Sequence, residues 1–201
     1  MDVYTTEEQQ VEAIKSWWRE NGKAILLGAV IGLGGLYGWR YYQSEQETSR
    51  EQASEAYMQV VGALAAGDAE AQEKATAFLQ SHDGAYTALV ELQLAKSFVE
   101  AGDLAKAAEQ LRSVKTAKDD ALKATATVRL ARIEAQQGNF DAALKELDGV
   151  TGDSWKPQVE ELRGDIELRK GDTNAARSAY AASIAAASNP VVQMKLDNLP
   201  Q

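Results

Sequence analysis

Residues 24–39 read AILLGAVIGLGGLYGW, an uncharged stretch between Lys23 and Arg40. At 1.5 Å per residue these residues would extend over roughly 24 Å as a helix. A membrane crossing needs about 20 residues. Arg40 can extend its long side chain toward the interface, and Tyr41 and Tyr42 add rings suited to the headgroup region. The stretch therefore predicts a transmembrane helix, and the rest of the chain is organised around it.

The sequence before this helix predicts an amphipathic leader over residues 1–23, with Thr5 or Thr6 as its N-cap. Val11, Ile14 and Trp18 recur at helical spacing and share one face. The leader carries several glutamates, and no small-x-small cleavage site follows the apolar stretch. We therefore expect an uncleaved signal-anchor helix over residues 24–42.

Basic residues and small residues give two further expectations for this helix. Three basic residues precede it and two follow it closely, which favours a cytoplasmic N-terminus. Small residues spaced by four allow close approach of another membrane helix. We expect helix packing in the membrane at Ala24, Gly28, Gly32, Gly34 and Gly38.

The body after the anchor is acidic and rich in alanine. The chain holds 30 acidic and 21 basic residues, of which 5 and 4 lie in the first 42, so the remainder has a net charge of −8. Such a domain repels phosphate backbones, and we expect no nucleic-acid partner. The absence of cysteine excludes disulfides and thiolate chemistry. Three prolines in 201 residues favour long helices.

A repeat of glycine followed by Asp or Asn recurs along this body. The glycines are Gly67, Gly102, Gly138 and Gly171, and their spacings bracket the roughly 34-residue period of tetratricopeptide repeats. The last three copies share small residues before and after the glycine and a large residue further on. These positions are Ala95, Ala131 and Gly164, then Ala107, Ala143 and Ala176, then Leu111, Leu147 and Tyr180. The first copy lacks most of this pattern.

This pattern predicts an all-α fold, a single transmembrane helix followed by a tetratricopeptide-like helical-repeat solenoid. We expect helices at about 44–66, 69–80, 85–100, 104–115, 120–137, 140–147, 155–170 and 173–187, with a short helix at the C-terminus. In such solenoids the first helix of each pair lines a concave side that binds a peptide or helix. The repeat register places these residues there: Leu92, Lys96, Val99, Val128, Arg132, Glu161, Asp165 and Leu168.

Catalytic chemistry has little support in this sequence. The single histidine, His82, lies in a turn signal, SHDG. Acid pairs such as Glu91 with Glu160 and Glu161, or Asp119 with Asp120, are typical of solvated helix faces and caps. We expect no catalytic residue, no cofactor and no metal site, and an interaction surface in place of an enzyme.

Several segments resemble a known family along nearly the whole chain. They are QVEAIKSWWRENGKAI, GWRYY, ELQLAKSFV, VRLARIEAQ, KGDTNAARSAY and QMKLDNL. Together they resemble the YfgM family of ancillary SecYEG translocon subunits of Gram-negative inner membranes. The resemblance implies a single-pass inner-membrane protein with a cytoplasmic N-terminus and a periplasmic repeat domain over residues 43–201. It also implies partners, namely the SecYEG subunits, a membrane-anchored periplasmic chaperone and newly secreted client proteins.

The expected function is a non-enzymatic, membrane-tethered scaffold at the Sec translocon that recruits periplasmic chaperones or newly secreted clients. An alternative role is a homo-oligomeric envelope adaptor or stress-signalling regulator that is not tied to the translocon. A further alternative inverts the topology and leaves the repeats in the cytosol.

Overall fold

A computed structural model of the chain describes residues 7–200, and every regular element in this range is an α-helix. The helices are α1 (Glu7–Ala66), α2 (Ala71–Ser81), α3 (Ala85–Glu100), α4 (Leu104–Val114), α5 (Asp120–Gln136), α6 (Phe140–Asp148), α7 (Lys156–Lys170), α8 (Thr173–Ala186) and α9 (Pro190–Asp197). The all-α prediction is confirmed, and most predicted ends lie within one or two residues of these bounds. Thr5 and Thr6 lie outside the described residues.

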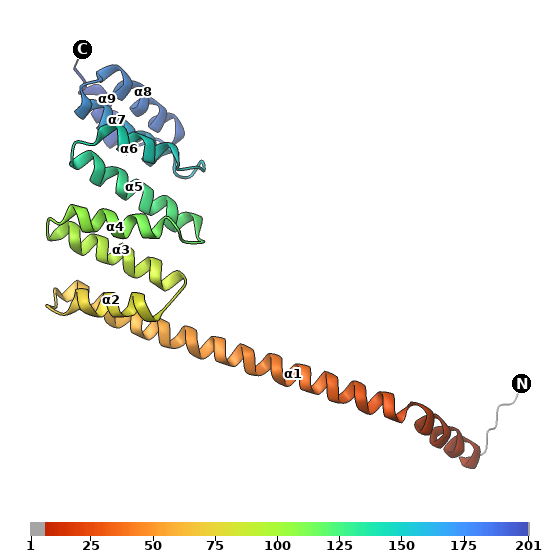
Figure 1. Ribbon diagram of the computed structural model, residues 1–201. Helices are drawn as coiled ribbons and strands as arrows, with labels where there is room; N and C mark the ends of the chain where they lie inside the picture. The colour runs from red at the N-terminus through yellow and green to blue at the C-terminus, as the bar shows by residue number, and fades with distance from the viewer. Residues whose placement is uncertain (1–6, 201) are drawn as a thin grey trace, which may run out of the picture. The chain divides into compact units, whose positions relative to one another are not determined.

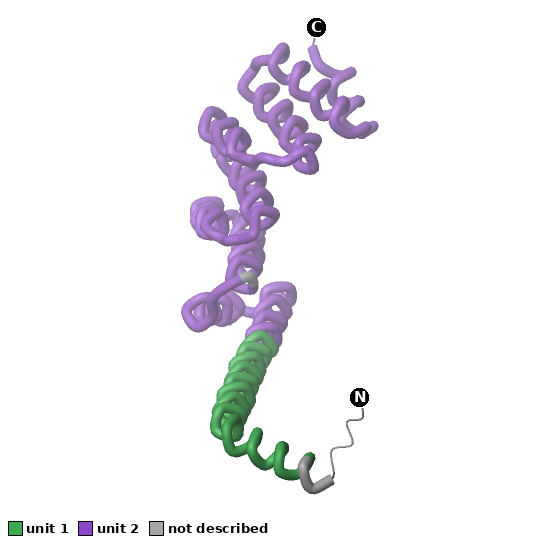
Figure 2. The backbone as a smooth tube through the Cα atoms, turned by 90° about the vertical axis from the view of Figure 1, so that its right-hand side faces the viewer, with its two compact units in different colours: residues 1–52 green, residues 53–201 purple. Residues whose placement is uncertain are grey.

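The chain divides into two compact units, and the boundary between them lies between Gln52 and Ala53 (Figure 2). The predicted leader, anchor and repeat-domain borders at residues 23 and 42 fall inside α1, and they stay predictions.

The described part of the first unit consists of α1 alone. Large apolar side chains of its anchor segment are exposed, among them Leu26 (59%), Val30 (68%) and Leu33 (68%). Exposing this much apolar surface to water is unfavourable, at about 25 cal/mol per Å². Within the described chain, α1 is the one helix long and apolar enough to cross a membrane by length and composition. It fits a single-pass membrane protein.

The second unit is a stack of helical hairpins (Figure 1). Helix α3 pairs with α4, α5 with α6, and α7 with α8, and these hairpins follow one another from α2 to α9. Three apolar clusters form the core along the stack. The first cluster also includes Val60, which lies in the last part of α1. Each hairpin thus buries its apolar face against its neighbours, as a solenoid requires.

The turns between paired helices share one backbone geometry. Gly102 and Gly138 adopt φ values of 79° and 84°, the left-handed region that favours glycine. The next residue donates its N–H back to the helix, from Asp103 to Phe98 at 2.8 Å and from Asn139 to Glu134 at 2.9 Å. The same bond closes the turns at Asp172 and at Asp68. The degenerate first copy therefore keeps the turn although it lacks the side-chain pattern.

The small residues of the repeat lie where the paired helices cross. Ala107, Ala143 and Ala176 are fully buried, and so are the large residues one turn later. In the last hairpin, Gly164 takes the small position on α7. A side chain there would overlap the ring of Tyr180 on α8, so this crossing admits only glycine without rearrangement.

Candidate partner-binding groove

The predicted groove residues fall into three groups in the structure. Leu92 and Val128 are 7% and 5% exposed and belong to the apolar core, so they do not line a surface. Inner helices such as α5 pack against the hairpins on both sides, which buries most of their circumference. The exposed strip of each inner helix is therefore narrower than the repeat register suggests.

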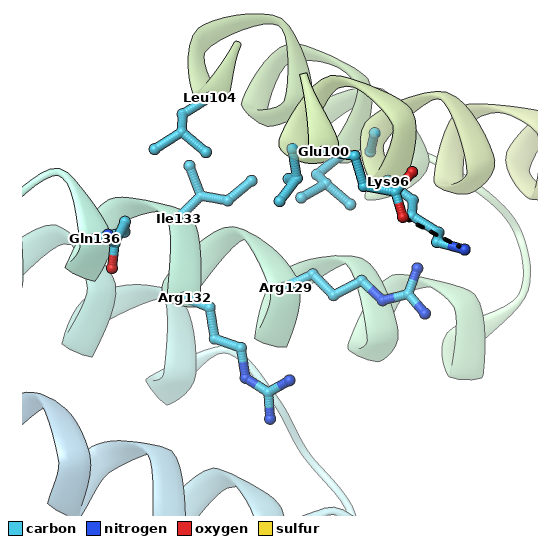
Figure 3. Close-up of a pocket in the computed structure, with 10 residues that line it drawn as sticks. Lys96, Glu100, Leu104, Arg129, Arg132, Ile133 and Gln136 are labelled. Carbon is cyan, nitrogen blue, oxygen red and sulfur yellow. Dashed lines mark ion pairs between the residues drawn. The ribbon is translucent and has the colours of Figure 1, made fainter. Parts of the chain in front are cut away.

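A second group meets in one hollow. Lys96, Val99 and Arg132 line a cavity of about 510 Å³ between α3, α4 and α5 (Figure 3). Its other lining residues are Ala95, Glu100, Leu104, Leu111, Arg129, Ile133 and Gln136. We call this cavity the α3–α5 groove. Three of the eight predicted groove residues therefore lie together in this cavity, and their binding of a partner stays a prediction.

The floor of the α3–α5 groove is apolar. Leu111 (1% exposed) and Ile133 (6%) form the bottom of the groove, and the buried Ala95 lies beside them in its lining. Val99 is 45% exposed and offers its side chain to an occupant. A floor of this kind can bury one or two apolar side chains of a partner.

The rim of the groove is mostly basic. Lys96 pairs with Glu100 at 3.7 Å along α3, and both side chains are about two-thirds exposed (66% and 65%), so this ion pair is weak. Arg129 and Arg132 are exposed on α5, and Figure 3 shows them on the same side of that helix. Residues three apart share a helix face.

Arg129 was missed by sequence reasoning, which selected its neighbour Val128. A signal was present, because VRLAR places two arginines three residues apart. One step along a helix turns a side chain by about 100°, so choosing the adjacent residue exchanges an exposed position for a buried one.

The third group lies on α7, and two of its three residues, Glu161 and Asp165, are occupied by the chain itself. Lys195 on α9 donates hydrogen bonds to Glu161 and to Asp165, each at 2.8 Å. The Tyr180 hydroxyl also donates to Asp165, at 2.8 Å. Leu168 is 38% exposed. Glu161 and Asp165 therefore hold the terminal helix in place.

Electrostatics agree with that role. Burial by itself lowers the pKa of Lys195, but the hydrogen bonds that it donates to Asp165 and Glu161 outweigh this effect, and the pKa lies above its usual value. Burial, with the hydrogen bond to Asp165, also raises the pKa of the Tyr180 hydroxyl. Lys195 stays charged and Tyr180 stays neutral at physiological pH, so both remain donors.

The remaining acidic candidates have structural contacts. Asp119 caps α5 by accepting from the backbone N–H groups of Ala121 and Leu122. Glu91 accepts from the Ser113 hydroxyl, and burial raises its pKa. His82 ends α2 and stacks on the Phe78 ring, with ring centroids 4.3 Å apart.

The small residues of the anchor lie on an exposed helix surface. A Cβ added at Gly28, Gly32, Gly34 or Gly38 would meet no atom within 4 Å apart from its chain neighbours and the adjoining backbone of its own helix. The surface beside these glycines is free to receive another helix, and the predicted packing at Ala24 and these four glycines stays a prediction.

Comparisons with known proteins agree with this helical-repeat fold. A family model described as a tetratricopeptide repeat-like domain matches residues 15–201. The ancillary SecYEG translocon subunit of Escherichia coli (strain K12) is 41% identical, over 99% of this chain and 99% of the relative. The chain belongs to the ancillary SecYEG translocon subunit family. The protein of that name from Haemophilus influenzae is 32% identical over 96% of this chain and 97% of its own.

Membership of this family confirms the resemblance noted in the sequence. A more distant relative with the same name, from Neisseria gonorrhoeae, is 24% identical and still covers 99% of this chain. The alignments with these relatives thus include both the apolar stretch and the repeats of this chain. A translocon subunit with a tetratricopeptide repeat-like domain is a non-catalytic kind of protein.

Proposed function

We propose that this protein is a single-pass scaffold of the inner membrane that works beside the Sec translocon. Its helical repeats recruit a membrane-anchored periplasmic chaperone or newly secreted clients. The observation that carries the proposal is the full-length similarity to proteins named ancillary SecYEG translocon subunits. The apolar α1 and the α3–α5 groove supply the two surfaces that such a scaffold needs.

The mechanism is binding. The anchor holds the repeats near the channel, and tethering raises the effective concentration of a bound partner there to about the millimolar range. A groove with weak contacts then suffices to retain a client or a chaperone at the channel exit. The small-residue side of the anchor is the surface we assign to translocon helices.

Photo-crosslinking in living cells tests the translocon contact. A photoreactive residue at Ile31 lies on the small-residue side of α1, and one at Leu33 lies nearly opposite, two residues further along. Both positions are similarly exposed, at 65% and 68%. We expect capture of a SecYEG subunit from Ile31 and much less from Leu33. Capture of only other copies of this chain would contradict the proposal and support the homo-oligomeric adaptor.

The proposed orientation places the N-terminus in the cytoplasm and the repeats in the periplasm. Lys15, Arg19 and Lys23 before the apolar stretch, against Arg40 and Arg50 after it, support it. A reporter enzyme that is active only in the periplasm, fused after residue 201, should be active in cells. An inactive reporter on a membrane-inserted chain would place the repeats in the cytosol.

A further inference from the structure

The charge around the α3–α5 groove is opposite to that of the domain that contains it. Residues 43–201 carry a net charge of −8. The groove has three basic residues, Lys96, Arg129 and Arg132, and one acidic residue, Glu100, around its apolar floor. A local basic rim on an acidic domain favours a negatively charged occupant.

Arg129 and Arg132 also differ from the other arginines of the second unit in their contacts. Across residues 53–200, four arginines contact a carboxylate, a carbonyl or an aromatic ring: Arg112, Arg163, Arg169 and Arg177. In the same described range, Arg129 and Arg132 have no such partner. Their guanidinium groups can therefore bind a carboxylate through paired N–H donors without breaking an existing contact.

Equivalent positions in the three hairpins show what complements this surface. Lys96, Arg132 and Asp165 each lie six residues before the turn glycine of their repeat. In the last repeat the chain supplies the opposite charge, because Lys195 of α9 binds Asp165. No helix does the same for Arg132 within the described chain. Lys96 has only the exposed pair with Glu100, so the strongest complement for this surface would be a partner that brings carboxylates to Arg129 and Arg132.

We propose that the α3–α5 groove binds an extended segment of a partner polypeptide in which carboxylate side chains flank large apolar ones. The apolar side chains contact Val99 and the floor, and the carboxylates bind Arg129, Arg132 and Lys96. The cavity volume of about 510 Å³ is enough for a few side chains. This proposal rests on the proposed function only in assuming that the repeats hold a protein partner.

A protein segment suits the groove better than nucleic acid. None of the ten lining residues is aromatic, so the groove offers no ring for base stacking, and the acidic domain repels a phosphate backbone. Acidic peptides combine carboxylates with side chains that fill an apolar floor.

Peptide binding to the full chain in phosphatidylcholine nanodiscs tests this proposal by fluorescence polarisation. The probe is the fluorescein-labelled peptide GDLLEIDG, compared with its amide counterpart GNLLQING and with GDSSESDG, which lacks large apolar side chains. We expect saturable binding of the first peptide, weakened by salt, and at least about tenfold weaker binding of the other two.

Charge-reversal variants assign the binding to the groove. Arg129→Glu with Arg132→Glu should weaken binding by about tenfold or more. The matched control, Lys118→Glu with Lys145→Glu, makes the same change in net charge at exposed residues outside the groove, and it should change binding by less than about twofold. Circular dichroism should show the same helix content in both variants.

Several results would overturn the proposal. These are no binding of GDLLEIDG up to about 1 mM, equal binding of its amide counterpart, or an equal loss in the control variant. Binding of phosphatidylglycerol vesicles that depends on Arg129 and Arg132, without peptide binding, would assign the groove to lipid instead. Failure here would leave the crosslinks from Ile31 to the translocon unchanged, so the two proposals fail separately.

Discussion

Gly164 shows how one residue sets the packing of the last hairpin. It lies on α7 directly against the Tyr180 ring of α8. The sequence marked this position as small, because Ala95 and Ala131 occupy it in the earlier repeats. Alanine fits at this position in those two repeats but is too large in the last one. The sequence alone did not show this difference, because it depends on the bulk of Tyr180 across the interface.

Gly164→Ala should therefore destabilise the repeat domain, by about 1–3 kcal/mol, because the added methyl group overlaps the Tyr180 ring. Gly62→Ala is the control, since a Cβ at Gly62 meets no atom within 4 Å in a helix, and alanine favours helix by about 0.5–1 kcal/mol. Thermal unfolding of the full chain in detergent measures both. Equal melting temperatures for the two variants would contradict the close contact between Gly164 and the Tyr180 ring.

Glu91 gives a residue-scale prediction of pH dependence. Burial raises the pKa of this carboxyl in the folded state above its unfolded value, and the Ser113 hydrogen bond offsets only part of this effect. The folded chain then binds the proton more tightly than the unfolded chain. The stability contributed by this group falls as pH rises from the unfolded pKa, about 4.3, through the raised folded value.

Glu91→Gln should consequently stabilise the domain at pH 7, by less than about 1 kcal/mol because the side chain is only partly buried, and the gain should vanish near pH 4. Glutamine keeps an oxygen that accepts from Ser113. Denaturant midpoints at the two pH values measure the difference. A variant that is less stable than the native chain at pH 7 would show that the charged form is favoured in the fold.

At the scale of elements, helix α9 is a terminal cap. Its Val192 is fully buried with Tyr180 and Leu199 in the third apolar cluster, and Lys195 binds Glu161 and Asp165. A solenoid needs such an element, because the last repeat has no successor to cover its apolar face. The inner surface of the last repeat is thereby occupied, which leaves the α3–α5 groove for a partner.

Lys195→Met should loosen α9 while the other helices stay folded. The raised pKa of Lys195 means that its ionic contribution is present at neutral pH and is lost as pH rises above about 10 through the folded value. Loss of a half-buried pair of this kind costs about 1 kcal/mol. Hydrogen exchange should speed up in α9 of the variant and stay unchanged in Lys145→Met. Equal exchange in α9 of both would show that Lys195 does not hold it.

Helix bounds were predictable because the local signals agree. Glycine in the left-handed conformation ends each first helix, and Asp103 and Asp172 cap the helices that follow.

The groove was predicted less well. Exposure along α5 depends on contacts with helices from other repeats, so Val128 is buried and Arg129 is exposed. The salt bridge from Lys195 to Asp165 links residues 30 apart, and no local pattern indicates it.

At the scale of the whole molecule, we propose that one chain joins an anchor for the channel to a groove for a partner. The Escherichia coli relative aligns with 99% of this chain, so the alignment includes both α1 and the helices that line the groove. If the anchor determines where the groove acts, replacing the anchor should change which proteins lie within reach of the groove in the cell. The groove itself would be unchanged. This dependence separates a translocon scaffold from a free-standing repeat protein.

The most direct measurement is photo-crosslinking from Val99 in cells, in the native chain and in a chain whose residues 24–39 are replaced by a glycine-free leucine-alanine segment. We expect the native chain to capture a periplasmic chaperone or a secreted polypeptide. The replaced chain, inserted to the same level, should capture several-fold less of it, because it no longer gathers at the channel. Equal capture of the same partner by both chains would contradict the proposed role of the anchor.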